Sequence, residues 1–211
     1  MDQLKTSRDR LGIFGGTFDP PHVGHLILAM EAYDQLKLNR VLWVLTPNPP
    51  HKIGKRISPA DIRITMVLES ISGDPAFELS RVDIDRPAPH YVLDTMKLLH
   101  QQYPLAELVF LMGGDSLLDL NTWHQSQEFI DSCDKIGVMH RVGEEIDLSE
   151  LEKELPGLKG KVEFIVAPLL EISSNRIRKL VSEDKPYRYY LLPKVYEIIQ
   201  KEDLYKELDE D

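Results

Sequence analysis

Short apolar segments alternate with segments of helical periodicity along most of this chain. Four of the apolar segments read LGIF, VLWVL, LVFLM and VEFIV. Continuous apolar runs of this length, bounded by turn signals, suit parallel strands that are covered on both faces. Strands that alternate with helices predict an α/β fold, with a doubly wound, mostly parallel sheet and helices on both faces.

The same patterns predict where the elements lie. Ser58 is expected to cap a helix that begins at Pro59, and the segment NTWHQSQEFI to form a short helix starting near Thr122. The acidic residues 144–158 are expected to be irregular, with room for a helical turn. We expect strands at 11–14, 41–45, 77–80, 108–112, 135–139 and 162–166, and further helices at 24–38, 91–101, 173–182 and 193–201.

The bulk properties narrow the function. The chain has 211 residues and a formal net charge of −10, which argues against general binding to nucleic acid or to an anionic membrane. It lacks an apolar stretch of the roughly 20 residues that a bilayer requires, and its first residues do not resemble a secretory signal. The single cysteine, Cys133, fits a reducing cytoplasm. We expect one domain at 10–205, helical from about 173, between a flexible lead-in at 1–9 and an acidic tail at 206–211.

The segment GGTFDPPHVGH, residues 15–25, carries the strongest chemical signal. A glycine turn follows the first strand, and His22 and His25 stand three residues apart at a helix start, where backbone N–H groups favour anions. This pattern indicates a phosphate site. Helix capping and packing would also explain the histidines. A zinc site is a weaker alternative, because no carboxylate or cysteine stands at the usual ligand spacing, and we expect no protein-held metal.

Four loops that follow strands should meet at one edge of the sheet, as ligand-binding loops do in such folds. They contain Gly15-Gly16, residues 48–52, Gly113-Gly114-Asp115 and residues 171–174. The edge would therefore join the histidine pair to basic and hydroxyl side chains from distant parts of the chain.

Taken together, these motifs resemble the nucleotidyltransferases with an H-x-G-H signature, and most closely the bacterial nicotinate-nucleotide adenylyltransferase family. The resemblance rests on GGTFDPPHVGH, PNPPHK at 47–52, residues 89–95, GGDSL at 113–117, Trp123 and ISSNRIR at 172–178. It covers nearly the whole chain and implies a Rossmann-like fold. Phosphopantetheine adenylyltransferases share parts of this pattern but usually carry another residue in place of His22.

The resemblance implies a reaction in NAD synthesis. Nicotinate mononucleotide and the AMP part of ATP would be joined to give nicotinate adenine dinucleotide and pyrophosphate. A phosphate monoester is largely ionised at pH 7, so this nucleophile needs no strong general base. Positioning and electrostatic stabilisation of the α-phosphate would supply most of the catalysis.

The family's site residues are carried over position by position. The catalytic group implied by the resemblance is His22, His25 and Arg178. ATP would contact Gly15, Gly16, Thr17, Phe18, Gly113, Asp115, Ile172, Ser173 and Ser174. The mononucleotide would contact Asp19, His51, Lys52, Tyr91, Asp94 and Trp123, with Trp123 stacked on the pyridine ring. Magnesium would bind with ATP and need few protein ligands.

The chain departs from the family pattern at three positions. Asn175 stands where threonine is usual, and His90 and Val92 flank Tyr91 where serine and threonine are common. Because the last two lie near the expected pyridine pocket, nicotinamide mononucleotide or dual specificity is an alternative substrate assignment. A non-catalytic nucleotide-binding module is a second alternative. A homo-oligomer is compatible with the sequence, which does not specify one.

Overall fold

The computed structural model describes residues 8–49, 56–141, 146–168 and 170–207. Its centre is a parallel sheet with strand order β3-β2-β1-β4-β5-β6. This is the order of a Rossmann-like fold, so the predicted fold class is confirmed. The strands are β1 (Arg10–Gly16), β2 (Arg40–Leu45), β3 (Phe77–Ser80), β4 (Glu107–Gly113), β5 (Lys135–Arg141) and β6 (Val162–Ala167).

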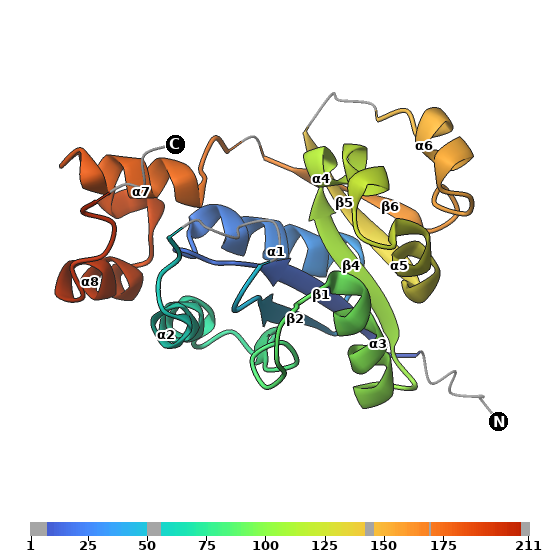
Figure 1. The fold of residues 1–211 in the computed structure, drawn as a ribbon, viewed down its shortest axis with the longest axis horizontal. Coiled ribbons are helices and arrows are strands. Elements are labelled where there is room, and N and C mark those ends of the chain that lie inside the picture. Colours follow the sequence, from blue (N-terminus) through green and yellow to red (C-terminus); the bar gives the residue numbers. More distant parts are fainter. Residues whose placement is uncertain (1–7, 50–55, 142–145, 169, 208–211) are drawn as a thin grey trace.

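Helices cover both faces of this sheet, as Figure 1 shows. One face packs against α1 and α2, which bury Ala29, Ala32 and Val67 with the β2 residue Trp43. The other face packs against α3 and α5. The helices are α1 (Val23–Gln35), α2 (Ala60–Ile71), α3 (Val92–Gln102), α4 (Gly114–Leu118), α5 (Ser126–Ser132), α6 (Ser149–Glu154), α7 (Ser174–Ser182) and α8 (Pro193–Lys201).

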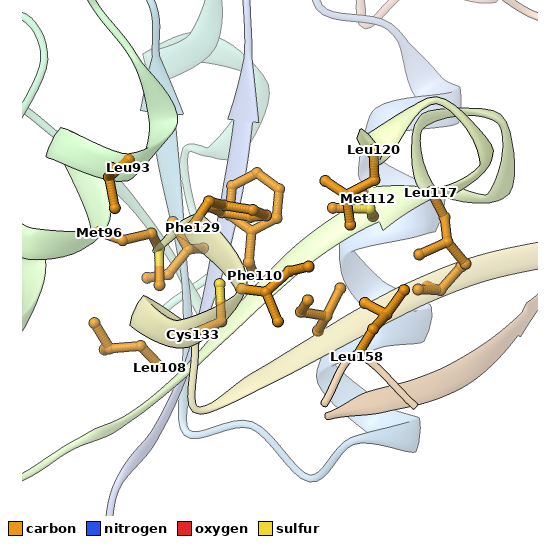
Figure 2. Close-up of a cluster of buried hydrophobic side chains, with 14 of the residues drawn as sticks. Leu93, Met96, Leu108, Phe110, Met112, Leu117, Leu120, Phe129, Cys133 and Leu158 are labelled. Carbon is orange, nitrogen blue, oxygen red and sulfur yellow. The ribbon is translucent and has the colours of Figure 1, made fainter. Parts of the chain in front are cut away.

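The larger core cluster lies between the sheet and α3 to α5 (Figure 2). Its centre is the β4 residue Phe110, whose ring meets that of Phe129 edge-on at a centroid distance of 5.1 Å. Leu108, Met112 and Met96 fill the space around them. This packing fixes β4, and with it the position of α4, which begins at the next residue.

The C-terminal helices α7 and α8 form a smaller unit beside α2 (Figure 1). Their contact is an apolar cluster in which Met66 of α2 packs with Ile177, Val195 and Ile199. α7 begins at Ser174, as the ISSNRIR motif predicted. The cluster therefore anchors that helix start near the carboxyl ends of the strands.

Two local predictions were wrong, and one helix was missed. Pro59, not Ser58, occupies the cap position of α2, which begins at Ala60. The predicted helix near Thr122 is a 3-10 turn at Leu120–Thr122, followed by α5 from Ser126. The sequence patterns also missed α4, a short helix directly after β4. Among the described residues, no helix has the length and apolar character needed to cross a membrane.

Candidate active site

The strand order reverses between β1 and β4. Ligands in such folds bind at this point, beyond the carboxyl ends of the strands, so the candidate site is placed there. β1 ends at Gly15-Gly16, and the carbonyl of Gly16 accepts a 2.9 Å hydrogen bond from the Thr46 N–H, so the loops after β1 and β2 are joined. A Cβ on Gly16 would lie 2.8 Å from the ring of Phe18, which itself has a positive φ of 50°. Only glycine fits this turn.

His22 and His25 lie together at the start of α1. Their rings stack with centroids 3.7 Å apart. His22 occupies the cap position, and its backbone N–H donates to Nδ1 of His25 over 3.1 Å. A neutral imidazole that accepts at Nδ1 carries its proton on Nε2. The cap therefore leaves His25 with one outward donor, Nε2–H.

His22 is held by burial rather than by a hydrogen bond to its ring from another described residue. The side chain is 6% exposed, and Nδ1 is buried without a hydrogen-bond partner among the described residues. Nε2 is therefore the ring nitrogen through which His22 can reach a ligand. A Cβ at Gly24 would lie 3.0 Å from Nδ1 of His22, so the glycine of the H-x-G-H motif makes room for this ring.

The environment keeps both imidazoles neutral. Burial lowers the pKa of His22 from 6.5 to about 4. Burial, together with repulsion from His22, holds the pKa of His25 well below 6.5. The aromatic rings of Phe18, Phe14 and Trp43 surround His25 at centroid distances of 5.2, 6.0 and 6.4 Å. An anion bound against the pair would raise both pKa values.

The start of α7 approaches the same loop from the opposite end of the chain. Ser173 caps the helix by accepting the Arg176 N–H, and Ser174 Oγ donates to the Pro20 carbonyl over 2.8 Å. Arg178 donates to the Asp19 carbonyl over 2.7 Å and to Asn175 Oδ1 over 2.6 Å. Asn175, one of the departures from the family pattern, therefore helps to orient Arg178.

Arg63 of α2 holds the surrounding loops together, and its importance was not visible in the sequence. The side chain is 1% exposed and donates to four backbone carbonyls within 3.0 Å. Those carbonyls belong to Ser58, Thr17, Thr46 and Pro47. Such a buried guanidinium takes the place of water for acceptors in two connections, the one after β1 and the one between β2 and α2, which would otherwise be buried unpaired.

Three of the predicted mononucleotide residues, Tyr91, Asp94 and Trp123, form a second group. Tyr91, at the cap position of α3, stacks on His124 at 4.1 Å, with Asp94 in the first turn of that helix. Trp123 is half-buried and packs against Phe129 at a centroid distance of 5.5 Å. Sequence reasoning missed His124, which has no motif of its own.

Buried His90 connects this second group to the loop after β2, since its Nδ1 lies 3.4 Å from the Asn48 carbonyl oxygen. Asp115 lies exposed in the first turn of α4. His51 and Lys52 lie outside the described residues.

Asp19 differs from what we expected of a ligand-contacting side chain. It is 3% exposed, and its carboxylate accepts hydrogen bonds from the Ser58 N–H and the Tyr205 hydroxyl. Tyr205 lies near the end of the described chain and belongs to no recognised motif. Among the described residues, no group of three or more His, Cys, Asp or Glu side chains is arranged to hold a metal ion.

A parallel sheet of this strand order, with a glycine turn at the end of β1 and an imidazole pair at the start of α1, is typical of nucleotidyltransferases. The family described as Cytidylyltransferase-like matches residues 13–180. A protein of Thermomicrobium roseum named "Probable nicotinate-nucleotide adenylyltransferase" is 42% identical over 200 residues, which span 95% of this chain and 93% of that protein.

A protein of the same name from Thermus thermophilus is 36% identical, over 93% of this chain and all of its own length. The chain belongs to the family of nicotinate-nucleotide adenylyltransferases. Its fold is also similar to that of Plasmodium falciparum nicotinic acid mononucleotide adenylyltransferase complexed with NaAD. That similarity has a TM-score of 0.77 at 21% identity and covers 94% of this chain and 98% of the other.

Proposed function

We propose that this protein joins nicotinate mononucleotide to the AMP part of ATP, with release of pyrophosphate, in NAD synthesis. The observation that carries the proposal is the convergence on residues 17–22 of two anion-binding features. One is the neutral imidazole pair at the start of α1, and the other is the start of α7 with Arg178. A triphosphate that reacts at one phosphorus needs two groups of donors, one at the reacting phosphate and one at the phosphates that leave.

The imidazole pair would act on the α-phosphate of ATP. Nε2 of His25 and Nε2 of His22 are the ring nitrogens left for a ligand. As the phosphoryl group transfers, charge develops on its oxygens, and fixed donors in a water-poor pocket stabilise that charge strongly. The backbone of Gly15, Gly16, Thr17 and Phe18 would border the nucleotide on the same side.

The start of α7 would hold the departing pyrophosphate. Ser173 and Ser174 lie at its first turn. The guanidinium of Arg178 has five N–H donors, and it donates two hydrogen bonds to protein acceptors, the Asp19 carbonyl and Asn175. Ile172 lies one residue ahead of the cap, where a Cβ on Gly24 would be 3.7 Å from its own Cβ. Pyrophosphate oxygens would therefore meet both helix starts.

Magnesium would enter as part of its ATP complex. The carboxylate of Asp19, three residues before His22 in the sequence, already accepts two protein hydrogen bonds. Phosphate oxygens and water would therefore be the ion's main ligands, as is common for Mg²⁺ bound with nucleotides. The ion would neutralise charge on the leaving group.

The nucleophile needs orientation more than activation. The mononucleotide phosphate is already ionised near pH 7, so an in-line approach to the α-phosphorus is the main requirement. Trp123, Tyr91 and Asp94 would line the pyridine side, and Asp115 with Gly113 the adenosine side. His51 and Lys52 would bind the mononucleotide phosphate. We expect the reaction to take place in the cytoplasm.

Steady-state kinetics on the two pyridine nucleotides tests this assignment. Pyrophosphate release is measured with ATP and either nicotinate or nicotinamide mononucleotide, and kcat/KM is compared. The proposal predicts a clear preference for the carboxylate substrate. A preference for the amide would contradict the substrate assignment. Pyrophosphate release with neither, despite tight ATP binding, would favour a non-catalytic module.

A further inference from the structure

The last described segment of the chain reaches back to the centre of the site. The Tyr205 hydroxyl donates a 2.6 Å hydrogen bond to Oδ1 of Asp19, across 186 positions in the sequence. Oδ2 of the same carboxylate accepts the Ser58 N–H over 3.1 Å. Both carboxylate oxygens thus have a donor from a different part of the chain.

Asp19 stands at the point where three elements are joined. It lies three residues before His22, and its backbone carbonyl accepts the 2.7 Å bond from Arg178. The neighbouring Pro20 carbonyl accepts Ser174 Oγ. The backbone from Asp19 to His22 therefore connects the C-terminal segment, the residues before α2 and the start of α7 to the imidazole pair.

A buried carboxylate keeps its place only when it is paired, because an unpaired charge away from water is costly. Asp19 is 3% exposed. Arg63 lies close enough to interact with both Asp19 and Tyr205, and Arg178 with Tyr205. The Tyr205 hydroxyl completes this buried charge network from the C-terminal side, where no other described side chain donates to Asp19.

We propose that Tyr205 is a positioning residue for adenylyl transfer, which holds the Asp19 carboxylate so that His22 and Arg178 keep their places at the reacting phosphate. This inference rests on the proposed function. Tyr205 itself does not touch the substrate. It acts through the backbone of residues 19–22. The apolar cluster around α8 holds Tyr205 in place.

The effect should fall on kcat. Contacts that strengthen as charge develops at the transferring phosphate lower the barrier, whereas binding of ground-state ATP depends on many other groups. A shift of a few tenths of an ångström in residues 19–22 weakens the contacts to the transferring phosphate more than it weakens the binding of ground-state ATP. Loss of the Tyr205 hydroxyl should therefore lower kcat about ten-fold and change KM for ATP by less than about three-fold.

The test compares Tyr205→Phe with Tyr187→Phe. Tyr187 lies in the same C-terminal unit, and its hydroxyl also has a hydrogen-bond partner, Gln200, but this partner belongs to that unit and not to the loop after β1. Both variants lose one hydroxyl and keep the ring. Kinetics are measured on the full chain, well below the melting temperature of each variant.

The proposal predicts the kcat loss in Tyr205→Phe and near-wild-type kcat in Tyr187→Phe, whatever their melting temperatures. Equal losses in both variants, or a kcat for Tyr205→Phe within two-fold of wild type, would overturn it. Asp19→Ala supplies a second comparison, since Tyr205→Phe should have no further effect on kcat in that background. An inactive wild-type chain would instead refute the proposed function.

Discussion

The two ring nitrogens of His25 have different roles, and substitutions can remove either role while keeping the other. Nδ1 accepts the His22 N–H over 3.1 Å and so caps α1, while Nε2–H remains as the donor to phosphate. The amide of an asparagine side chain ends near the position of Nδ1, and that of glutamine reaches the position of Nε2. His25→Asn therefore keeps an acceptor for the cap, and His25→Gln keeps a donor for the ligand.

The magnitudes follow from these bonds. Removal of one fixed donor from a developing oxyanion costs about 3 kcal/mol, or roughly 10²-fold in kcat. Removal of a helix cap costs about 1 kcal/mol of unfolding free energy. We expect His25→Asn to lose roughly 10²-fold in kcat with little loss of stability. We expect His25→Gln to lose about 1 kcal/mol of stability and much less activity.

Two assays decide the matter. Initial rates of pyrophosphate release at saturating substrates give kcat for each variant. Unfolding in urea at pH 7.5 gives the free energy of unfolding. The two variants serve as controls for each other, since each removes what the other keeps. If His25→Asn retained a kcat within about three-fold of wild type, Nε2–H would not be the donor that stabilises the transferring phosphate.

Three further predictions concern stability and fit. The lowered pKa of His22, about 4 against 6.5, means that the unfolded chain takes up a proton first as pH falls, so stability is lost between pH 6.5 and 4. Between pH 7.5 and 5, the free energy of unfolding measured with urea should fall by about 2 kcal/mol more in wild type than in His22→Gln. Equal falls would contradict the pKa assignment. Arg63→Lys should cost about 3 kcal/mol, because an ammonium cannot serve four carbonyls, and an unchanged melting temperature would argue against that role. Gly24→Ala should displace the His22 ring and lower kcat, whereas Gly160→Ala, whose Cβ meets only a carbonyl at 3.7 Å, should not.

The fold could be predicted because its signals are local. β3 lies at the predicted Phe77–Ser80 and α8 at the predicted Pro193–Lys201, since apolar runs and helix-start signals determine such elements within a few residues. The region around Thr122 was harder to predict. There, extended backbone at Trp123 and left-handed backbone at Gln125, with a φ of 51°, separate the 3-10 turn from α5, while the Trp123 ring packs on Phe129. Trp123 also meets Phe110 of β4 edge-on at 6.3 Å, and that contact is tertiary, so no local pattern contains it.

The positions of the candidate site residues were predictable to the same extent. The histidine pair and the start of α7 carry dense motifs, and the structure brings both to residues 17–22. Arg63 and Tyr205 carry none, because their partners are backbone carbonyls and a carboxylate from distant segments. A lone arginine in a helix or a tyrosine near the chain end looks ordinary until the folded chain surrounds it.

Position-specific labelling of ATP tests the central claim, attack on the α-phosphorus, most directly. The purified chain is incubated with nicotinate mononucleotide and either α-³²P or γ-³²P ATP, and the products are separated. We predict the α label in the dinucleotide and the γ label in pyrophosphate. An α label that stays in ADP, with the γ label on the mononucleotide, would contradict the account.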